Sequence, residues 1–147
     1  MIHLSAELID EIKQEAEKAY PNECCGFIFG NMDTKEKTAV QIKASKNTTI
    51  SSEQYHRFVI SPASMLKAER YARQKGFDIV GFYHSHPDCK AVPSEYDTIH
   101  ALPVYSYIIV SAAEGKAVEL TSWELDKNSD YSKFLSEKIV TDKGEMK

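Results

Sequence analysis

The stretch Gly81-Phe82-Tyr83-His84-Ser85-His86-Pro87 ends an apolar run that begins at Phe77, and it holds two histidines separated by one residue. The aromatic and β-branched residues of the run predict a buried β-strand over 77–84. Because side chains alternate between the faces of a strand, His84 and His86 point the same way, with Cα atoms about 6.6 Å apart. Two imidazole rings so placed can converge on one metal ion, each at about 2.0–2.1 Å. The stretch therefore predicts a metal site at the end of a strand.

Helices and strands follow one another along the rest of the chain. Ser5 before an apolar stripe at spacings of three and four, and Ser61-Pro62 followed by Gly76, indicate two capped helices. Apolar or alternating runs indicate strands. Helices are predicted at 5–19, 61–76, 94–102 and 130–140, and strands at 23–30, 37–44, 57–60, 77–84, 104–111 and 116–124. No linker separates these elements, so we expect one α/β domain over residues 1–147, a mixed β-sheet flanked by helices, with a disordered tail from about residue 141.

The composition is that of an ordinary globular protein, with 42% hydrophobic residues, 27% charged residues and a net charge of −4. A chain of 147 residues can bury a core without disulfides or a structural metal. We expect no nucleic-acid partner, because no dense Lys/Arg run is present, and no membrane span, because no apolar run approaches about 18 residues. The N-terminus lacks the pattern of a secretory signal. Cys24 and Cys25 are adjacent and no Cys-x-x-Cys motif occurs, so we expect reduced cysteines in a cytoplasmic protein.

A third metal ligand is predicted downstream of the histidines. Pro87 and Pro93 bracket a loop that leads into the short helix 94–102, whose first turn holds Asp97. Two histidines and one carboxylate leave a zinc ion one open position for water, which is typical of catalytic zinc. Ser94 lies on the same helix face as Asp97 and can donate a hydrogen bond to the oxyanion of a tetrahedral intermediate. The same two residues also fit a capping box, a purely structural role that is compatible with the first.

Glu23 is the candidate general base and acid. It begins an apolar strand beside Cys24 and Cys25, where burial would raise the pKa of its carboxyl toward neutrality. Such a group can accept a proton from water and pass it to a leaving amine. Taken alone, a glutamate at a strand end is more often solvated, so the role depends on the other site residues.

In combination, these residues resemble the motif of the JAMM (MPN+) zinc metallopeptidases, and in particular small single-domain prokaryotic-type members. That motif is an upstream glutamate, His-x-His-Pro, a serine after seven residues and an aspartate after two more, and the resemblance extends over about residues 20–110. It implies an MPN (cytidine-deaminase-like) fold, with zinc as the cofactor. It implies that zinc-bound water attacks with help from the glutamate, cleaving peptide or isopeptide bonds at the C-terminus of a ubiquitin-like or sulfur-carrier protein. The implied residues are His84, His86 and Asp97 as zinc ligands, Glu23 as general base and acid, and Ser94 as oxyanion donor.

The substrate is expected to present a flexible tail. Such a tail could add as a strand to a sheet edge that leads to the metal, with the polar segments 45–56 and 87–93 as walls of the channel. The chain lacks room for the large insertions of relatives selective for polyubiquitin, which favours a sulfur-carrier or general ubiquitin-like substrate. A homodimer is compatible with the apolar face of the first helix and with the sheet edges.

Three rival readings stay open on the sequence alone. Cys24 or Cys25 with His84 would make a cysteine protease, which requires a thiol of depressed pKa. Two histidines and one carboxylate also occur in mononuclear iron oxygenases, although Glu23 and Ser94 would then have no role. The third is a non-catalytic, zinc-stabilised adaptor that binds a ubiquitin-like partner.

Overall fold

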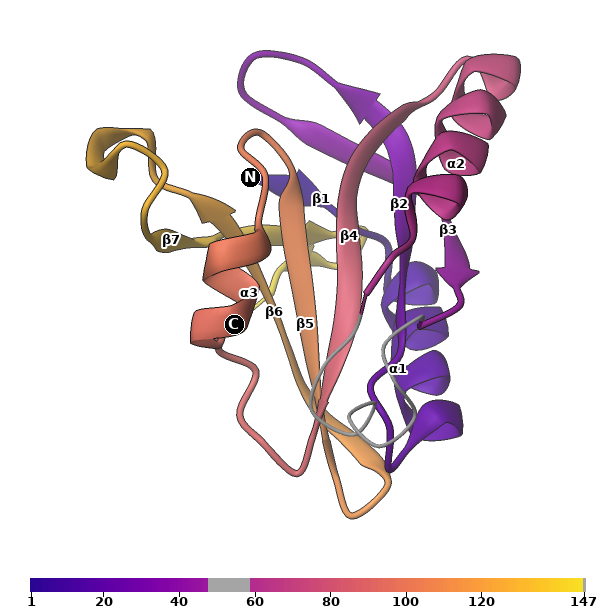
Figure 1. Ribbon diagram of the computed structural model, residues 1–147, viewed down its shortest axis with the longest axis vertical. Helices are drawn as coiled ribbons and strands as arrows, with labels where there is room; N and C mark the ends of the chain where they lie inside the picture. The colour runs from indigo at the N-terminus through magenta and orange to yellow at the C-terminus, as the bar shows by residue number, and fades with distance from the viewer. Residues whose placement is uncertain (48–58, 147) are drawn as a thin grey trace.

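The strand that carries both histidines is β4 (Asp78–Pro87), and it lies in the middle of a mixed sheet (Figure 1). The computed structural model describes residues 1–47 and 59–146. The helices of this part are α1 (Ala6–Ala19), α2 (Pro62–Lys75), α3 (Glu95–His100) and the 3-10 helix η2 (Lys127–Ser129). The other strands are β1 (Ile2–His3), β2 (Cys25–Met32), β3 (Lys37–Ser45), β5 (Ser106–Ala113), β6 (Lys116–Leu125), β7 (Phe134–Glu137), β8 (Ile139–Thr141) and β9 (Gly144–Glu145).

The strands described join in one sheet in the order β7-β6-β5-β4-β2-β3-β1-β8-β9. The central β4 pairs antiparallel with β2, where Cys25 lies opposite His84, and parallel with β5, where Ile109 lies opposite His84. Burial on both faces explains the apolar character of these strands. The predicted α/β architecture, a mixed sheet flanked by helices, is confirmed.

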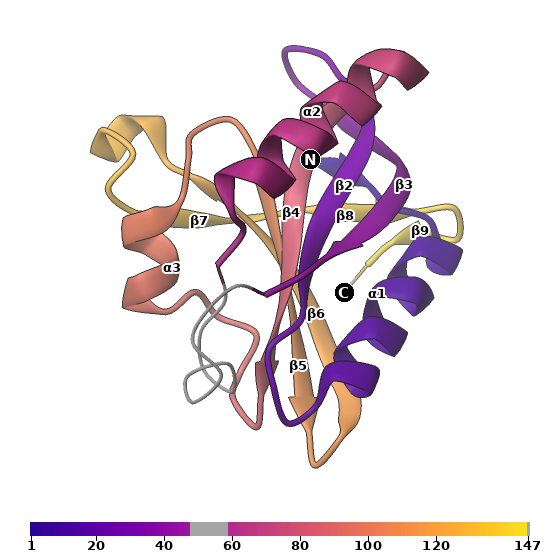
Figure 2. The same cartoon turned by 45° about the vertical axis from the view of Figure 1, so that its right-hand side comes forward.

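Two helices cover the sheet through separate apolar clusters. Ile12 of α1 belongs to one cluster with Ile28 and Tyr83, whereas Ala68 of α2 belongs to another with Phe82. Because Phe82 and Tyr83 are neighbours on β4, their side chains point to opposite faces, and α1 and α2 therefore cover opposite faces. His84 and His86 share the face of Phe82. The short α3 lies apart from the other two helices in both views (Figures 1 and 2).

The helix caps follow the sequence prediction closely. The Ser5 side chain accepts a hydrogen bond from the Leu8 amide, and Ser61 accepts one from the Ser64 amide at 3.1 Å. Gly76 ends α2 in the left-handed conformation with φ of 72°, which glycine adopts without strain. None of the helices described is long and apolar enough to cross a membrane.

The predicted helix at 130–140 is wrong, because β7 and β8 occupy that segment. Glu137 accounts for the strand: its Oε1 accepts hydrogen bonds from Ser106 Oγ at 2.6 Å and Ser122 Oγ at 2.8 Å, and Lys37 Nζ lies 3.3 Å from its Oε2. These partners lie on β5, β6 and β3, 15 to 100 residues away along the chain, so no local pattern encodes them.

The structure also bears on the predicted tail, on the predicted strand at 57–60 and on the predicted loop at 45–56. Where we expected a disordered tail from about residue 141, Gly144 pairs with Thr141 in a β8–β9 hairpin. Val59 and Ile60 lie outside any strand, although the sequence predicts a strand at 57–60, whose first two residues fall outside the part described. Most of the predicted polar loop at 45–56 also falls outside the residues described.

Candidate functional site

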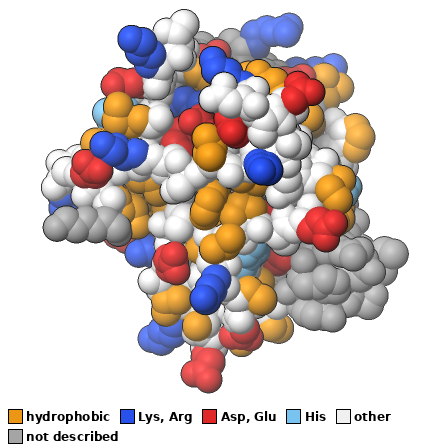
Figure 3. All heavy atoms as spheres, turned by 90° about the vertical axis from the view of Figure 1, so that its left-hand side faces the viewer, with side chains coloured by type: hydrophobic (Ala, Val, Ile, Leu, Met, Phe, Trp, Pro, Cys, Tyr) orange, Lys and Arg blue, Asp and Glu red, His pale blue; other side chains and the backbone are white. Residues whose placement is uncertain are grey.

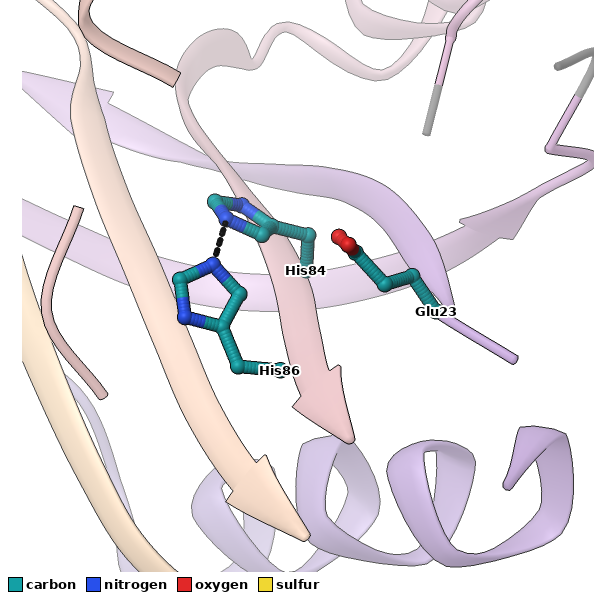
Figure 4. Close-up of side chains that lie close together, drawn as sticks. All are labelled: Glu23, His84 and His86. Atoms are coloured by element: carbon teal, nitrogen blue, oxygen red, sulfur yellow. Dashed lines mark hydrogen bonds between the residues drawn. The ribbon is translucent and has the colours of Figure 1, made fainter. Parts of the chain in front are cut away.

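Both histidines lie in regular strand structure, because β4 continues to Pro87, past the predicted end at residue 84. His84 is 1% exposed and His86 is 7% exposed. Their side chains lean toward each other from the same face of the strand, with 3.2 Å between the two Nε2 atoms (Figure 4). The strand geometry therefore brings the two ring nitrogens together, as the spacing predicted.

Asp97, in the first turn of α3, brings a carboxylate oxygen to the same point. Its Oδ2 lies 3.2 Å from His84 Nε2 and 3.0 Å from His86 Nε2. Tetrahedral zinc with bonds of about 2.0–2.1 Å has ligand atoms about 3.3 Å apart. The three atoms thus have the spacing of three corners of a zinc tetrahedron, and two imidazole nitrogens with one carboxylate oxygen are a donor set that suits zinc. The residues fit the metal that the sequence predicts.

A backbone carbonyl orients His86. The oxygen of Lys90 lies 2.9 Å from His86 Nδ1, so the Nδ1–H donates to it and Nε2 is left to face Asp97. Lys90 belongs to the segment between Pro87 and Pro93 that was predicted as a channel wall. Sequence reasoning missed this contact, because a carbonyl oxygen is present at every residue and its direction depends on the fold.

Glu23 completes the group from the other side. It lies just before β2, it is 6% exposed, and its carboxylate points toward the ring of His84 (Figure 4). One ligand atom each of Glu23, His84 and His86 lies within 4.8 Å of the others. Among the residues described, Glu23 Oε1 is buried and has no hydrogen-bond partner. The carboxyl of Glu23 is therefore buried close to both histidines, with an oxygen that no described group satisfies.

Burial raises the pKa of Glu23 to about 8, with a smaller lowering by His86 and a smaller raising by Asp97. A carboxyl with a pKa near neutrality can both accept and release a proton during turnover. The sequence prediction of a partly desolvated Glu23 agrees with this environment.

The ionisation of Asp97 is coupled to that of His84 and His86. Burial acts to raise the pKa of Asp97, but hydrogen bonds with His84 and His86 outweigh it and hold that pKa well below its usual range. Burial lowers the pKa of His84. For His86 burial also acts to lower the pKa, but hydrogen bonds with Asp97 and the Lys90 carbonyl outweigh it and raise the pKa. An ionised Asp97 beside a neutral His84 is the protonation state that metal ligands need.

Ser94 forms the capping box with Asp97. Its Oγ accepts from the Asp97 amide at 3.0 Å, and its own amide donates to Asp97 Oδ2 at 2.9 Å. The second bond holds the oxygen that faces the histidines, so the cap also positions the carboxylate. Because Oγ is the acceptor in its bond, the hydroxyl proton is left to donate elsewhere. The predicted role of Ser94 as oxyanion donor stays a prediction.

An apolar pocket of about 360 Å³ adjoins this centre. His84 and Asp97 line it on one side, and its other walls include Met65 of α2 and Phe82 of β4. On the face that carries α3, hydrophobic side chains gather near the centre, beside histidine and acidic side chains (Figure 3). The pocket can therefore take apolar groups next to the predicted metal position.

Cys24 and Cys25 are unsuited to nucleophilic catalysis. Cys24 and Cys25 are buried and free, and burial raises the pKa of the first to about 11 and of the second to about 12. A nucleophilic cysteine needs the opposite shift, toward the thiolate. A cysteine protease built on either of these two residues would therefore lack its essential group.

In the absence of metal, Glu23→Gln is expected to stabilise the protein at about pH 9 by about 2–4 kcal/mol, and to change stability little below about pH 4.5. The folded-state pKa of Glu23, about 8, exceeds the ordinary 4.5, so the folded protein keeps a proton that the unfolded chain has released. The stability from this group is complete below about pH 4.5 and is lost as the pH rises through about 8. Glutamine imitates the neutral carboxyl and avoids that loss.

Urea unfolding of both metal-free proteins at about pH 4 and about pH 9 measures this difference. Equal free energies of unfolding at the higher pH would contradict the desolvation of Glu23.

The comparisons with known proteins identify the family of this chain. Residues 5–126 match the family described as prokaryotic homologs of the JAB domain. The desampylase of Pyrococcus furiosus is 33% identical over 122 residues, which cover 82% of this chain and 76% of the relative. The desampylase of Haloferax volcanii is 31% identical over 115 residues, covering 75% of this chain and 80% of the relative.

Solved structures extend the agreement to the fold. A Desulfitobacterium hafniense protein, determined in solution, superposes with a TM-score of 0.81 at 29% identity, over 96% of this chain and 92% of the other. The sequence match and the fold therefore lead to one conclusion. This chain belongs to the prokaryotic homologs of the JAB domain, small members of the JAMM metallopeptidase family.

Proposed function

We propose that this chain is a zinc-dependent hydrolase that cleaves the peptide or isopeptide bond at the C-terminus of a ubiquitin-like or sulfur-carrier protein. The observation that carries the proposal is the convergence of His84, His86 and Asp97, with ligand atoms 3.0–3.2 Å apart, beside the buried Glu23. The names of the two relatives support the substrate class, since a desampylase removes Samp, a ubiquitin-like modifier.

Each residue has one task in the proposed reaction. A zinc ion held by His84, His86 and Asp97 would act as a Lewis acid toward the scissile carbonyl and would acidify water. Glu23 takes a proton from the attacking water and delivers it to the leaving nitrogen, for which a pKa of about 8 is well matched. Ser94 donates its hydroxyl proton to the developing oxyanion. The Lys90 carbonyl keeps His86 in the required orientation.

The surroundings of the site favour a flexible substrate. An extended tail can reach a centre whose ligands are buried, whereas a folded surface cannot. The 360 Å³ pocket beside His84 and Asp97 offers apolar walls to the tail's side chains. We expect the tail to lie between α2 and α3, where these walls are.

An iron oxygenase and a non-catalytic adaptor each explain fewer observations. The oxygenase would use the two histidines and Asp97 but would leave the buried, unpartnered Glu23 Oε1 unexplained. The adaptor would have no use for a carboxyl of raised pKa beside the proposed zinc ligands.

Cleavage of a defined fusion tests the proposal. The substrate is a Samp modifier of Pyrococcus furiosus whose C-terminal carboxyl is joined to a reporter domain. Zinc-loaded protein is expected to cut this fusion directly after the last residue of the modifier. Mass spectrometry of the two products locates the cut. The same fusion, with the last two residues of the modifier replaced by proline, serves as control. Binding without cleavage would support the adaptor, and oxygen consumption by iron-loaded protein would support the oxygenase.

A further inference from the structure

A cationic groove lies between α2 and the β2–β3 hairpin, away from the predicted metal. It has a volume of about 520 Å³. Four basic side chains line it: Lys43, Lys46, Lys67 and Arg70. Among the described residues that line it, none carries a carboxylate, although the chain as a whole has a net charge of −4. The groove therefore concentrates positive charge on an acidic protein.

Aromatic side chains form the floor of the groove. Phe27, Phe29 and Tyr71 line it, and the Lys43 ammonium sits 3.8 Å from the centre of the Tyr71 ring. The Tyr71 hydroxyl in turn donates to Gln41 Oε1 at 2.9 Å. A cation held over an aromatic ring is partly ordered before any partner arrives, which lowers the entropic cost of binding.

Glu69, the acidic residue of α2, does not line this groove. It lies instead along a different hollow, together with Arg73. Lys67 and Arg70 of α2 therefore share the groove with no acidic residue of the same helix. All four basic side chains of the groove are exposed to solvent. Their charge is available to an acidic partner.

The groove lies within reach of the predicted metal. Ser45 lines it and pairs with Cys25, which pairs on its other side with His84. Two interstrand spacings of about 4.8 Å separate the backbones of Ser45 and His84 by about 10 Å. An extended tail of five or six residues spans roughly 16–20 Å. A folded domain whose tail reaches the metal can therefore rest on the groove.

Among the described residues, the neighbouring edge of the sheet carries no further strand along most of β3. β1 pairs with β3 only at Lys37 and Thr38, so residues 39–45 pair only with β2 within the part of the chain described. Figure 2 shows α2 lying over β2 and β3 beside this edge. A sheet edge that carries no further strand among the described residues, next to the Lys43 ammonium over the Tyr71 ring, is a feature of surfaces that receive another protein.

From these observations we infer that the groove is a docking site for an acidic surface on the folded body of the ubiquitin-like substrate, an inference that rests on the proposed function. Long-range attraction between the groove and that surface speeds encounter. Docking of the body then makes entry of the tail an intramolecular step, which raises the effective concentration of the scissile bond at the metal. The groove thus selects for the protein to which the tail belongs.

The test compares a protein substrate with a peptide. Both carry the same last six residues of the Pyrococcus furiosus Samp modifier and the same reporter, but the peptide lacks the folded body. The variant Lys67→Glu with Arg70→Glu reverses two charges of the groove. Its control, Lys18→Glu with Lys116→Glu, makes the same change in net charge at exposed positions of α1 and β6.

For the groove variant, the ratio of kcat/KM for the protein substrate to kcat/KM for the peptide is expected to fall about tenfold at low salt, mainly through KM. Screening at about 0.5 M NaCl should reduce the fall to less than about twofold. The control variant should keep the parent ratio. An unchanged ratio in the groove variant overturns the inference.

A binding measurement separates this inference from the proposed function. The Samp body without its tail, labelled with a fluorophore, should bind the parent protein with salt-sensitive affinity and bind the groove variant about tenfold more weakly. Such binding without cleavage of either substrate would overturn the proposed function and sustain the docking site. Cleavage of both substrates without this binding would do the reverse. Competition by a single-stranded oligonucleotide that binds the groove more tightly than the body would assign the groove to nucleic acid and overturn the inference.

Discussion

Glu23→Gln is expected to lower kcat for the Samp fusion by about 1,000-fold while zinc stays bound. General acid–base catalysis contributes roughly 10²–10⁴-fold, and Glu23 is proposed to act in both proton transfers. The amide has the size of the carboxyl but can neither accept nor deliver the proton at neutral pH. Because Glu23 is not one of the three proposed ligands, the zinc content should stay at that of the parent. Steady-state kinetics with metal analysis on the same preparation measures both quantities.

Glu137→Gln provides the matched control. Glu137 is as buried as Glu23, at 6% exposure, but it lies in the network with Ser106 and Ser122. Its replacement is expected to cost stability and to leave kcat close to the parent value. If Glu23→Gln cleaves the fusion as fast as the parent does, the proton-transfer role assigned to Glu23 is wrong.

Asp97→Asn is expected to weaken zinc binding by more than about 100-fold and to abolish cleavage at limiting zinc. Removal of groups that only support metal ligands already costs about 10–100-fold, so removal of an anionic ligand should cost more. Asparagine can still accept the hydrogen bond from the Ser94 amide, so the cap of α3 is retained. The loss should therefore come from the missing charge beside His84 and His86. Competition against a chromogenic chelator measures the affinity.

Asp126→Asn tests whether the effect is specific to the site. Asp126 caps η2 by accepting from the Asn128 amide at 2.9 Å, a comparable capping role away from the histidines. This variant should bind zinc like the parent. Zinc affinity at the parent level in Asp97→Asn would remove Asp97 from the ligand set and leave Glu23, His84 and His86 as the group that holds the ion.

The parts of the fold that the sequence predicts well depend on local chemistry. Ser5, Ser61 and Gly76 cap helices through contacts within a few residues, so their patterns were sufficient for α1 and α2. The strands β7 and β8 depend instead on Glu137, whose partners lie 15 to 100 residues away. A pattern of a dozen residues contains no information on such partners, and the helix predicted there is wrong for that reason.

The candidate site also has features that the sequence predicts and features that only the fold decides. Spacing alone indicated His84 and His86, because strand geometry makes every second side chain parallel. The helix after the loop bracketed by prolines indicated Asp97 and Ser94, and the start of an apolar strand indicated Glu23. The resemblance to a known motif joined them with the histidines into one site, and the sequence thus determined the identity of the groups and the class of chemistry.

Only the tertiary structure decided how these groups meet. It brings Glu23 beside His84 across 61 residues of chain, by pairing β2 with β4, and it buries the carboxyl enough to raise its pKa to about 8. It also aims the Lys90 carbonyl at His86 and gathers basic side chains of β3 and α2 around one groove. The environment of Glu23 and the charge of the groove depend on distances between segments that are remote in sequence, and the Lys90 contact depends on how the loop after β4 folds back. Burial and Coulomb interactions act through such distances. Composition and spacing determine which groups are available, and packing determines their environment.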